Sequence, residues 1–241
     1  MKRLDLFLFE EGLTSSRTEA RRIIESGCVK VNGALVNKPS FLVEDGVSVE
    51  IAQPERKYVS RGGFKLEGAI DGFGISVSGK KCLDVGASSG GFTDCLLKNG
   101  AVSVIAVDSG IGQLVHSLRN DSRVISIEKY NARYMKREDL PYSPELTVVD
   151  VSFISLTLLL PSIFSVLTDG GELVCLIKPQ FEVGRGGVGK GGIVKSEALR
   201  RDAVTKVVGF AESIGFCSCG VIPSPIEGGD GNVEFLAYFK K

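Results

Sequence analysis

The pattern of apolar and polar residues changes near residue 57. Before that point, short segments with helical or alternating spacing follow one another, and glycines close both helical segments. The capping-box sequence Ser16–Glu19 predicts a helix start, and Asn32-Gly33 is typical of a type I′ hairpin turn. The elements expected in this part are helices over 4–12 and 16–27 and strands over 28–31, 34–37 and 47–51.

After residue 57, apolar strands alternate with helical stretches, which is typical of a doubly wound α/β sheet. Strands are expected near 81–85, 102–107, 123–127, 146–151, 172–177, 217–222 and 234–239. The stretch Gln53–Lys57 is polar, contains a proline and has no periodicity, so we interpret it as a linker. The sequence predicts a small N-terminal α+β domain over 1–52, a linker over 53–57 and a Rossmann-like α/β domain over 58–241.

A glycine turn follows the strand expected at 81–85. The segment Gly86–Phe92 leads into a predicted helix, and the next strand ends in Asp108. This spacing suits an adenosine-bearing cofactor, because glycines let backbone amides approach it and the later carboxylate binds ribose hydroxyls. A turn that serves only packing is the alternative.

The spacing within this turn decides which cofactor is expected. The dinucleotide fingerprint G-x-G-x-x-G is not met, because Ala87-Ser88-Ser89 lies between Gly86 and Gly90. The string D-x-G-x-S-x-G-G-F, which begins at Asp84, resembles instead the first motif of S-adenosylmethionine-dependent methyltransferases. We therefore expect S-adenosylmethionine, with NAD as the alternative.

Charge and cysteine content exclude several other classes. The 29 basic and 29 acidic residues leave no global attraction to nucleic acid, so RNA binding would need a local patch. Six cysteines form no C-x-x-C pair and accompany a single histidine, which argues against a metal site. The most apolar segment, Leu146–Leu160, is too short for a membrane span and contains Asp150. With no signal peptide in the sequence, we expect a cytoplasmic protein without membrane contact.

A local basic patch is expected at the start of the second helix. Arg17, Arg21 and Arg22 lie in its early turns, close to the free backbone amides at the helix start. Guanidinium groups and such amides both bind phosphate oxygens. A solvated helix face is the alternative. The pattern Ser16-Arg17-x-x-Ala20, continued through Asn32-Gly33, resembles the RNA-binding module of the small-subunit ribosomal protein S4.

Charged residues also lie at the ends of predicted strands. Asp150 and Lys178 each end an apolar run, Glu234 opens the last strand, and Lys65 begins a helix before the sheet. Ligands of open α/β sheets bind at the carboxyl ends of the strands, so these side chains are candidate site residues. The alternative for each of these residues is that it is charged only because the chain reaches solvent at the end of a strand.

Longer motifs surround these residues. Tyr58–Leu66, Asp150–Ser155, Ile177–Glu182 and Gly231–Glu234 resemble the TlyA or hemolysin A family, almost from end to end. That family joins the RNA-binding module to an FtsJ-like methyltransferase domain. The resemblance implies ribose 2′-O-methylation of ribosomal RNA or ribosomal subunits, with a catalytic tetrad of Lys65, Asp150, Lys178 and Glu234. The implied cofactor residues are Gly86, Ser88, Gly90, Phe92, Asp108 and Asn131.

Each member of this tetrad has an expected role. Lys178 is expected to take the proton of the ribose hydroxyl, which a lysine can do only when its amine is uncharged. Lys65 would favour that uncharged form and position the hydroxyl. Asp150 and Glu234 would orient both amines. Methyl transfer from a sulfonium needs no metal, and positioning supplies much of the acceleration.

Some alternatives stay open. Within the glycine-rich segment Gly184–Gly192, Gly184–Lys190 matches G-x-x-x-x-G-K, but Gly191 replaces the hydroxyl residue of a phosphate loop, so a lid or a plain loop is expected. A pore-forming hemolysin and an RNA-binding module without catalysis are the alternative functions. The target nucleotide, the ribosomal subunit and the oligomeric state do not follow from the sequence.

Overall fold

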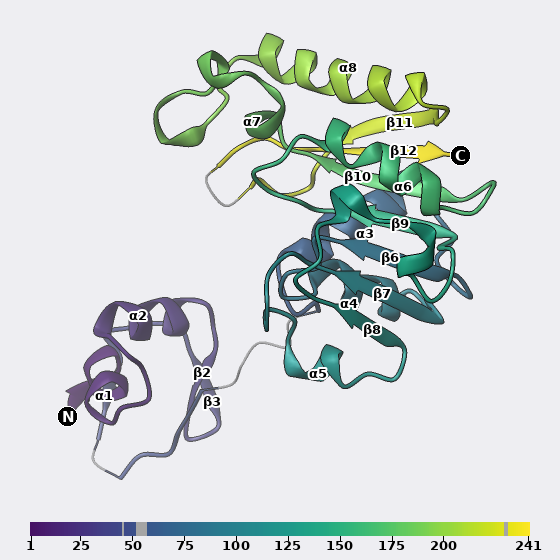
Figure 1. Ribbon diagram of the computed structural model, residues 1–241. Helices are drawn as coiled ribbons and strands as arrows, with labels where there is room; N and C mark the ends of the chain where they lie inside the picture. Colours follow the sequence, from purple (N-terminus) through teal and green to yellow (C-terminus); the bar gives the residue numbers. More distant parts are fainter. Residues whose placement is uncertain (45, 52–56, 229–230) are drawn as a thin grey trace. The chain divides into compact units, whose positions relative to one another are not determined.

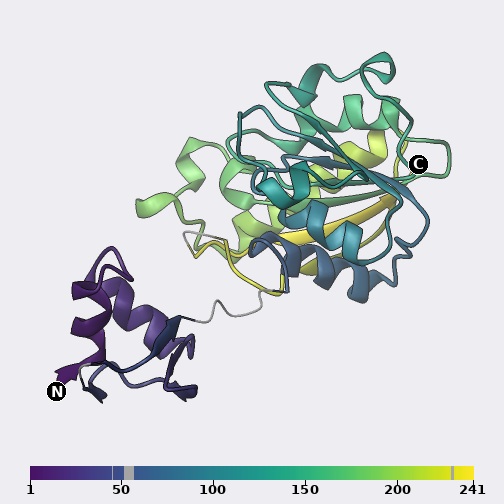
Figure 2. The ribbon, with the colours of Figure 1, turned by 90° about the horizontal axis from the view of Figure 1, so that it is seen from below.

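The computed structural model describes residues 1–44, 46–51, 57–228 and 231–241. It divides into two compact units, Met1–Lys57 and Tyr58–Lys241, each with its own buried core. Figures 1 and 2 show both units, which are described separately below. Apart from Lys57, the predicted linker lies outside the described residues.

In its described residues, the N-terminal unit has two helices, a three-stranded antiparallel sheet and a short strand pair. The helices α1 and α2 cover Leu4–Glu10 and Arg17–Glu25. The sheet has the order β3-β2-β5, with bounds Ala34–Val36, Val29–Val31 and Val49–Ile51. The strand pair, β1 (Lys2–Arg3) with β4 (Leu42–Val43), is absent from the sequence prediction, because two-residue strands are too short to show alternation.

Local signals in this unit are confirmed at the hairpin and in part at the helix cap. Asn32 and Gly33 have φ values of 49° and 81°, as a type I′ turn requires. The Ser16 side chain accepts a hydrogen bond from Glu19 N, which confirms the start of α2. The Glu19 carboxylate, however, accepts from Ser15 N, one residue earlier than a capping box predicts.

The C-terminal unit is built on a seven-stranded sheet with the order β11-β12-β10-β9-β6-β7-β8 (Figure 1). All neighbouring strands are parallel except β12, which is antiparallel to both β10 and β11. In chain order the bounds are β6 Lys81–Val85, β7 Ser103–Val107, β8 Val124–Ile127, β9 Leu146–Val149, β10 Glu172–Ile177, β11 Cys217–Pro223 and β12 Phe235–Lys240. The predicted Rossmann-like α/β fold is confirmed.

Helices cover both faces of this sheet. Their bounds are α3 Gly62–Phe73, α4 Gly91–Lys98, α5 His116–Arg119, α6 Leu160–Val166, α7 Pro179–Glu182 and α8 Glu197–Ser213. Leu66 of α3 and Leu96 of α4 belong to the core on one face. Ile163 of α6 and Val207 of α8 belong to the core on the other face. The sheet is therefore buried on both sides, which explains its near-continuous apolar strands.

The predicted site residues meet at one edge of this sheet. The parallel strands β6, β7, β9 and β10 lead directly into Gly86, Asp108, Asp150 and Lys178. Because β12 is antiparallel, its first residue Phe235 pairs with Ile177, the last residue of β10. Glu234, which precedes β12, therefore reaches the same edge from the opposite chain direction.

Candidate active site

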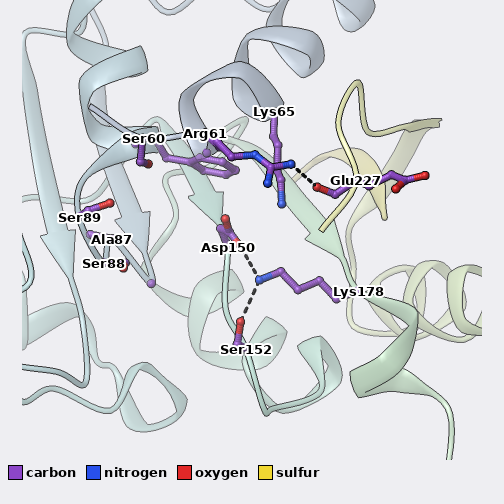
Figure 3. A pocket seen from close by; sticks show the side chains of 14 residues that line it. Ser60, Arg61, Lys65, Ala87, Ser88, Ser89, Asp150, Ser152, Lys178 and Glu227 are labelled. Atoms are coloured by element: carbon purple, nitrogen blue, oxygen red, sulfur yellow. Dashed lines mark hydrogen bonds and ion pairs between the residues drawn. The ribbon is translucent and has the colours of Figure 1, made fainter. Parts of the chain in front are cut away.

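Two adjacent cavities open at this edge. The lysine cavity, of about 300 Å³, lies between the start of α3 and the ends of β6, β9 and β10; it contains Lys65 and Lys178 (Figure 3). The Asp108 cavity, of about 460 Å³, lies at the ends of β6, β7 and β9. Gly86, Ser88, Asp150 and Ser152 line both cavities. Groups bound in the two cavities would therefore be neighbours.

The turn after β6 forms the wall that the two cavities share. Gly86 has a φ of 86°, and a Cβ at this position would lie 2.3 Å from the carbonyl oxygen of Asp150. Only glycine fits such a close approach of two backbones. Ser88 also has a positive φ, 48°, which is uncommon for a residue with a side chain. This constrained backbone leaves room for a ligand at the strand ends.

Asp108 lines only the Asp108 cavity, and its carboxylate joins two turns. Its Oδ2 accepts a hydrogen bond from Ser88 N at 2.8 Å, and its Oδ1 accepts from Gly110 N at 2.7 Å. Each carboxylate oxygen keeps a further lone pair for a ligand. Asn131 lines the same cavity, and its Oδ1 also accepts from Arg133 N at 3.1 Å. Carboxylate and amide thus face the cavity with fixed orientations.

Two residues of the predicted cofactor set lie elsewhere. Phe92 lines the lysine cavity and is 3% exposed, so its ring belongs mostly to the core. Gly90 is not among the residues that line either of these two cavities. A Cβ at Gly90 would lie 2.3 Å from Cδ1 of Leu118 in α5, so close packing requires glycine there. Glycine spacing alone does not distinguish such packing from ligand contact.

The four tetrad residues form two ion pairs. Nζ of Lys65 lies 2.5 Å from Oε2 of Glu234, and Nζ of Lys178 lies 2.7 Å from Oδ1 of Asp150. The side chains of Lys65 and Glu234 are 10% and 3% exposed. Lys178 meets Asp150 because β10 and β9 are neighbouring strands, whereas Lys65 of α3 meets Glu234, which precedes β12. Lys65, Asp150 and Lys178 line the lysine cavity.

Asp150 and Glu234 were expected to orient the two amines. Among the described residues, each carboxylate forms an ion pair with one of the two lysines. A third group completes the surroundings of Lys178, whose Nζ donates to Ser152 Oγ at 2.9 Å (Figure 3). Ser152 has no assigned role in the sequence analysis, because a serine after a strand is a common residue in any loop.

Arg61 is a second residue that the sequence reasoning missed. It lines the lysine cavity and donates through Nη2 to the main-chain oxygen of Glu227 at 3.0 Å (Figure 3). It belongs to the motif Tyr58–Leu66, from which only Lys65 was selected. Positive charge at the mouth of the cavity suits a negatively charged ligand such as an RNA backbone.

Asp84 is a buried acid beneath the glycine turn. It is fully buried in β6, and its Oδ2 accepts a hydrogen bond from Thr93 Oγ1 of α4 at 2.7 Å. Burial raises the pKa of Asp84 to about 7, and the carboxylates of Asp150 and Asp108 add to this effect. In the sequence, the signal for this buried acid was a carboxyl group within an apolar strand. The Asp84–Thr93 hydrogen bond links β6 to α4 across the glycine turn.

The glycine-rich segment 184–192 follows α7 and contains two short 3₁₀ turns, Arg185–Gly187 and Lys190–Gly192. A phosphate loop needs a strand before it and a long helix after it, so this segment is not one. Its end is fixed by Asn232, which is 1% exposed. The Asn232 amide donates to Gly192 O at 2.9 Å and accepts from Val194 N at 3.0 Å.

Neither a metal cluster nor a membrane-spanning helix occurs in the described ranges. No group of three or more histidine, cysteine or acidic residues there is arranged to hold a metal ion. None of the helices in those ranges is long and apolar enough to cross a membrane. Cys82, Cys95 and Cys175 are buried, as expected for small core residues.

The N-terminal unit carries an arginine cluster on a buried acid. Asp5, which is fully buried, accepts hydrogen bonds from Arg3, Arg17 and Arg21 at 3.0–3.2 Å. The bond from Arg3, with those from Arg21 and Arg17, holds the pKa of Asp5 at about 2. Arg22, the third predicted residue, is exposed on α2 and makes none of these bonds. The cluster combines three positively charged guanidinium groups with one negatively charged carboxylate. Its net charge is therefore two positive charges.

Comparisons with known proteins agree with this architecture. The FtsJ-like methyltransferase family matches residues 58–241, and the S4 domain matches residues 2–49. "Hemolysin A" of Brachyspira hyodysenteriae is 48% identical over 98% of this chain and 99% of its own length. "16S/23S rRNA (cytidine-2'-O)-methyltransferase TlyA" of Mycobacterium tuberculosis is 44% identical over 99% of this chain and 89% of its own.

A solved structure is similar over the whole chain. It is named as a hemolysin from Streptococcus thermophilus, is 44% identical, covers 100% of this chain and 88% of its own, and has a TM-score of 0.77. The sheet, the glycine turn and the paired lysines thus define an FtsJ-like, S-adenosylmethionine-dependent methyltransferase. The chain belongs to the TlyA/hemolysin A family, in which this domain follows an S4 domain.

Proposed function

We propose that this protein transfers a methyl group from S-adenosylmethionine to a ribose 2′-hydroxyl of ribosomal RNA. The observation that carries the proposal is the pair of lysine–carboxylate contacts beside a cavity that adjoins the Asp108 cavity. The M. tuberculosis relative, whose name specifies cytidine 2′-O-methylation of 16S and 23S rRNA, supports the substrate class.

The Asp108 cavity suits the adenosine part of the cofactor. Its size lies within the usual range for small-molecule sites, roughly 300–1,000 Å³, and Asp108 offers acceptors that match ribose hydroxyls. Asn131 and the backbone of Gly86 and Ser88 would hold the rest of the nucleoside. When bound, the cofactor supplies an electrophilic methyl group on a sulfonium. A methionine tail directed toward Ser88 and Asp150 would bring that methyl toward the lysine cavity.

The lysine cavity supplies the proton acceptor. In our proposal the uncharged amine of Lys178 takes the proton of the ribose 2′-hydroxyl while the oxygen accepts the methyl group. The carbon–sulfur bond would break, and its electron pair would stay on the sulfur, which leaves as a neutral thioether. Asp150 and Ser152 hold the ammonium that results. Lys65, fixed by Glu234, orients the hydroxyl by donating a hydrogen bond to it. Because Lys178 is paired with Asp150, it must release its own proton before it can act as the base.

The N-terminal unit is proposed to hold the RNA. Arg17 and Arg21 keep outward N–H groups after bonding Asp5, and guanidinium groups bind phosphate oxygens with two parallel hydrogen bonds. Arg22 on the same helix would add a further phosphate contact. Such contacts position the RNA without reading its bases. The domain over 1–52 would thus bind the RNA, and the domain over 58–241 would transfer the methyl group. The proposed substrate is ribosomal RNA or ribosomal subunits in the cytoplasm.

The direct test in cells is a map of ribose methylation. Ribosomal RNA from cells with and without the gene is compared position by position, and cells expressing the Lys178→Ala variant are included. We expect at least one ribose methylation that requires both the protein and Lys178. Identical maps in all three strains would contradict the proposal.

A further inference from the structure

Two segments that follow neighbouring strands contact each other at three places. We define the β9 segment as residues 150–156 and the β10 segment as residues 178–182, which includes α7. At one end, the Lys178 amine contacts both Asp150 and Ser152 (Figure 3). In the middle, the ring centroids of Phe153 and Phe181 lie 5.1 Å apart. These contacts join two of the motifs found in the sequence.

The third contact is made by Glu182, which has no role in the chemistry above. Its side chain is 1% exposed. One carboxylate oxygen accepts from Leu156 N at 2.7 Å, and the other accepts from Ser155 Oγ at 2.6 Å. Lys206 of α8 lies 3.2 Å from the same carboxylate and donates to the Glu182 main-chain oxygen at 2.9 Å. A buried carboxylate persists only where such donors compensate its lost hydration.

The β9 segment requires an anchor of this kind. Phe153 has a φ of 66°, a conformation that is costly for a residue with a bulky side chain, and it is 91% exposed. Burial of its side chain therefore contributes little to holding this backbone. A strained conformation persists when the surrounding contacts determine it. Here the Lys178 contacts fix the chain before Phe153, and the Glu182 contacts fix it afterwards.

We propose that Glu182 is a positioning residue for the active site. Its carboxylate holds the β9 segment against the β10 segment and so fixes Asp150 and Ser152 around the Lys178 amine. The catalytic part of this inference rests on the proposed function, in which Lys178 is the base. Since a displacement of about 1 Å can cost about 100-fold in rate, an anchor two residues beyond Phe153 affects the chemistry without touching substrate.

The test compares three variants of the full-length protein. Glu182→Ala removes both contacts to the β9 segment, Glu182→Gln keeps an acceptor for Leu156 N, and Lys206→Met removes only the contact to α8. Two quantities are measured: hydrogen–deuterium exchange of the peptide that contains Leu156, and single-turnover methylation of ribosomal subunits at saturating S-adenosylmethionine. We expect Glu182→Ala to speed exchange and to lower the rate about 100-fold. Glu182→Gln should lose about 10-fold. Lys206→Met should lower stability, because the buried carboxylate loses a counter-charge, but it keeps both contacts to the β9 segment, so its exchange and rate should stay close to those of the wild type.

Three results would overturn the inference. The first is unchanged exchange of the Leu156 peptide in Glu182→Ala. This result would show that Glu182 does not hold the β9 segment, and it does not depend on methylation by the wild type. The second is faster exchange at a wild-type rate, and the third is an equal loss in Glu182→Ala and Lys206→Met. If Glu182→Ala fails to fold, the Glu182→Gln and Lys206→Met variants carry the same comparison. A wild-type protein without activity contradicts the proposed function instead.

Discussion

Glu234 and Lys65 form an ion pair of 2.5 Å although 169 residues separate them in the chain. Lys65 lies on α3, before the first strand of the sheet, and Glu234 precedes the last strand. Both side chains are at most 10% exposed. The pair joins the beginning and the end of the C-terminal unit beside the lysine cavity. An ion pair in this position can fix the amine for catalysis or simply stabilise the fold, and the two roles are separable.

Replacing Glu234 tests which role dominates. Glu234→Gln keeps a hydrogen-bond acceptor for Lys65 but removes the charge, so we expect a loss of about 1–3 kcal/mol in the free energy of unfolding. Methylation should fall by a larger factor than this loss explains, because Lys65 would no longer be held toward the hydroxyl. The measurements are thermal unfolding and initial methylation rates at a temperature where both proteins are folded.

A matched control exists in the same sheet. Glu172, the first residue of β10, pairs with Lys80 at the opposite end of the strands and is also mostly buried. Glu172→Gln should cost comparable stability and leave the methylation rate close to that of the wild type. Equal rate losses in both variants would mean that the Lys65–Glu234 pair serves stability alone.

The Asp108 cavity yields a second prediction. Asp108→Ala removes the acceptors expected to bind the cofactor ribose and also frees the amides of Ser88 and Gly110. Loss of hydrogen bonds to a charged group, about 1.5–3 kcal/mol, should weaken S-adenosylmethionine binding by roughly 10- to 100-fold. Calorimetric titration measures this directly. Asp121→Ala, in an exposed turn, is the control and should bind normally. Binding of NAD without binding of S-adenosylmethionine would reject the cofactor assignment.

The arginine cluster predicts the salt dependence of RNA binding. Replacing Arg17 and Arg21 together with Ala should weaken binding to ribosomal RNA and lower the slope of log affinity against log salt by about one to two units. Arg123 directly precedes β8, at the end of the strands opposite the cavities. Arg123→Ala should therefore not change that slope. Cofactor binding should be unaffected in every variant. An unchanged slope in the double variant would mean that these arginines serve only to neutralise buried Asp5.

Asp84 predicts a pH dependence of stability. Its pKa is raised to about 7 by burial, so folding disfavours the ionised form. The unfolded chain then binds fewer protons than the folded one between about pH 4 and pH 7, and stability decreases over this range as the pH rises. Asp84→Asn lacks this effect while keeping an acceptor for Thr93. Its advantage over the wild type should grow from pH 4 to pH 7, by up to about 4 kcal/mol, and stay constant above.

Denaturant unfolding at several pH values measures this advantage. Asp121→Asn is the control, because Arg123 holds the pKa of Asp121 at about 2. Its contribution to stability is present above about pH 4 and is lost only as the pH falls below that value. The difference between Asp121→Asn and the wild type should therefore be constant from pH 4 to pH 7. A similarly flat difference for Asp84→Asn would contradict the assigned shift.

Much of the fold was predictable because its signals are local. The apolar runs that became β6, β9 and β10 are bounded by turns, and the positive φ values at Asn32 and Gly33 follow from the residue types. The strand pair β1–β4 was missed because its paired residues, Lys2 with Val43 and Arg3 with Leu42, are distant in the chain and show no alternation pattern.

The site was predictable to a lesser degree. Strand ends and motifs pointed to Lys65, Asp150, Lys178 and Glu234, but the pairing of each lysine with one carboxylate depends on the strand order. Asp5 could not be connected with Arg17 from sequence, because an acid in a short helix is ordinarily solvated. Ser152 and Glu182 depend on tertiary contacts that no spacing indicates.

In the proposed reaction, Lys178 removes the proton of a ribose hydroxyl in ribosomal RNA. The most direct measurement is single-turnover transfer of labelled methyl from S-adenosylmethionine to ribosomal subunits by the wild type and by Lys178→Ala, with the product mapped to its position and S-adenosylmethionine affinity measured in parallel. We predict a 2′-O-methylated ribose with the wild type. With Lys178→Ala we predict a rate lower by at least about 100-fold at nearly unchanged cofactor affinity. Substantial turnover by Lys178→Ala, or methylation on a base, would contradict the account.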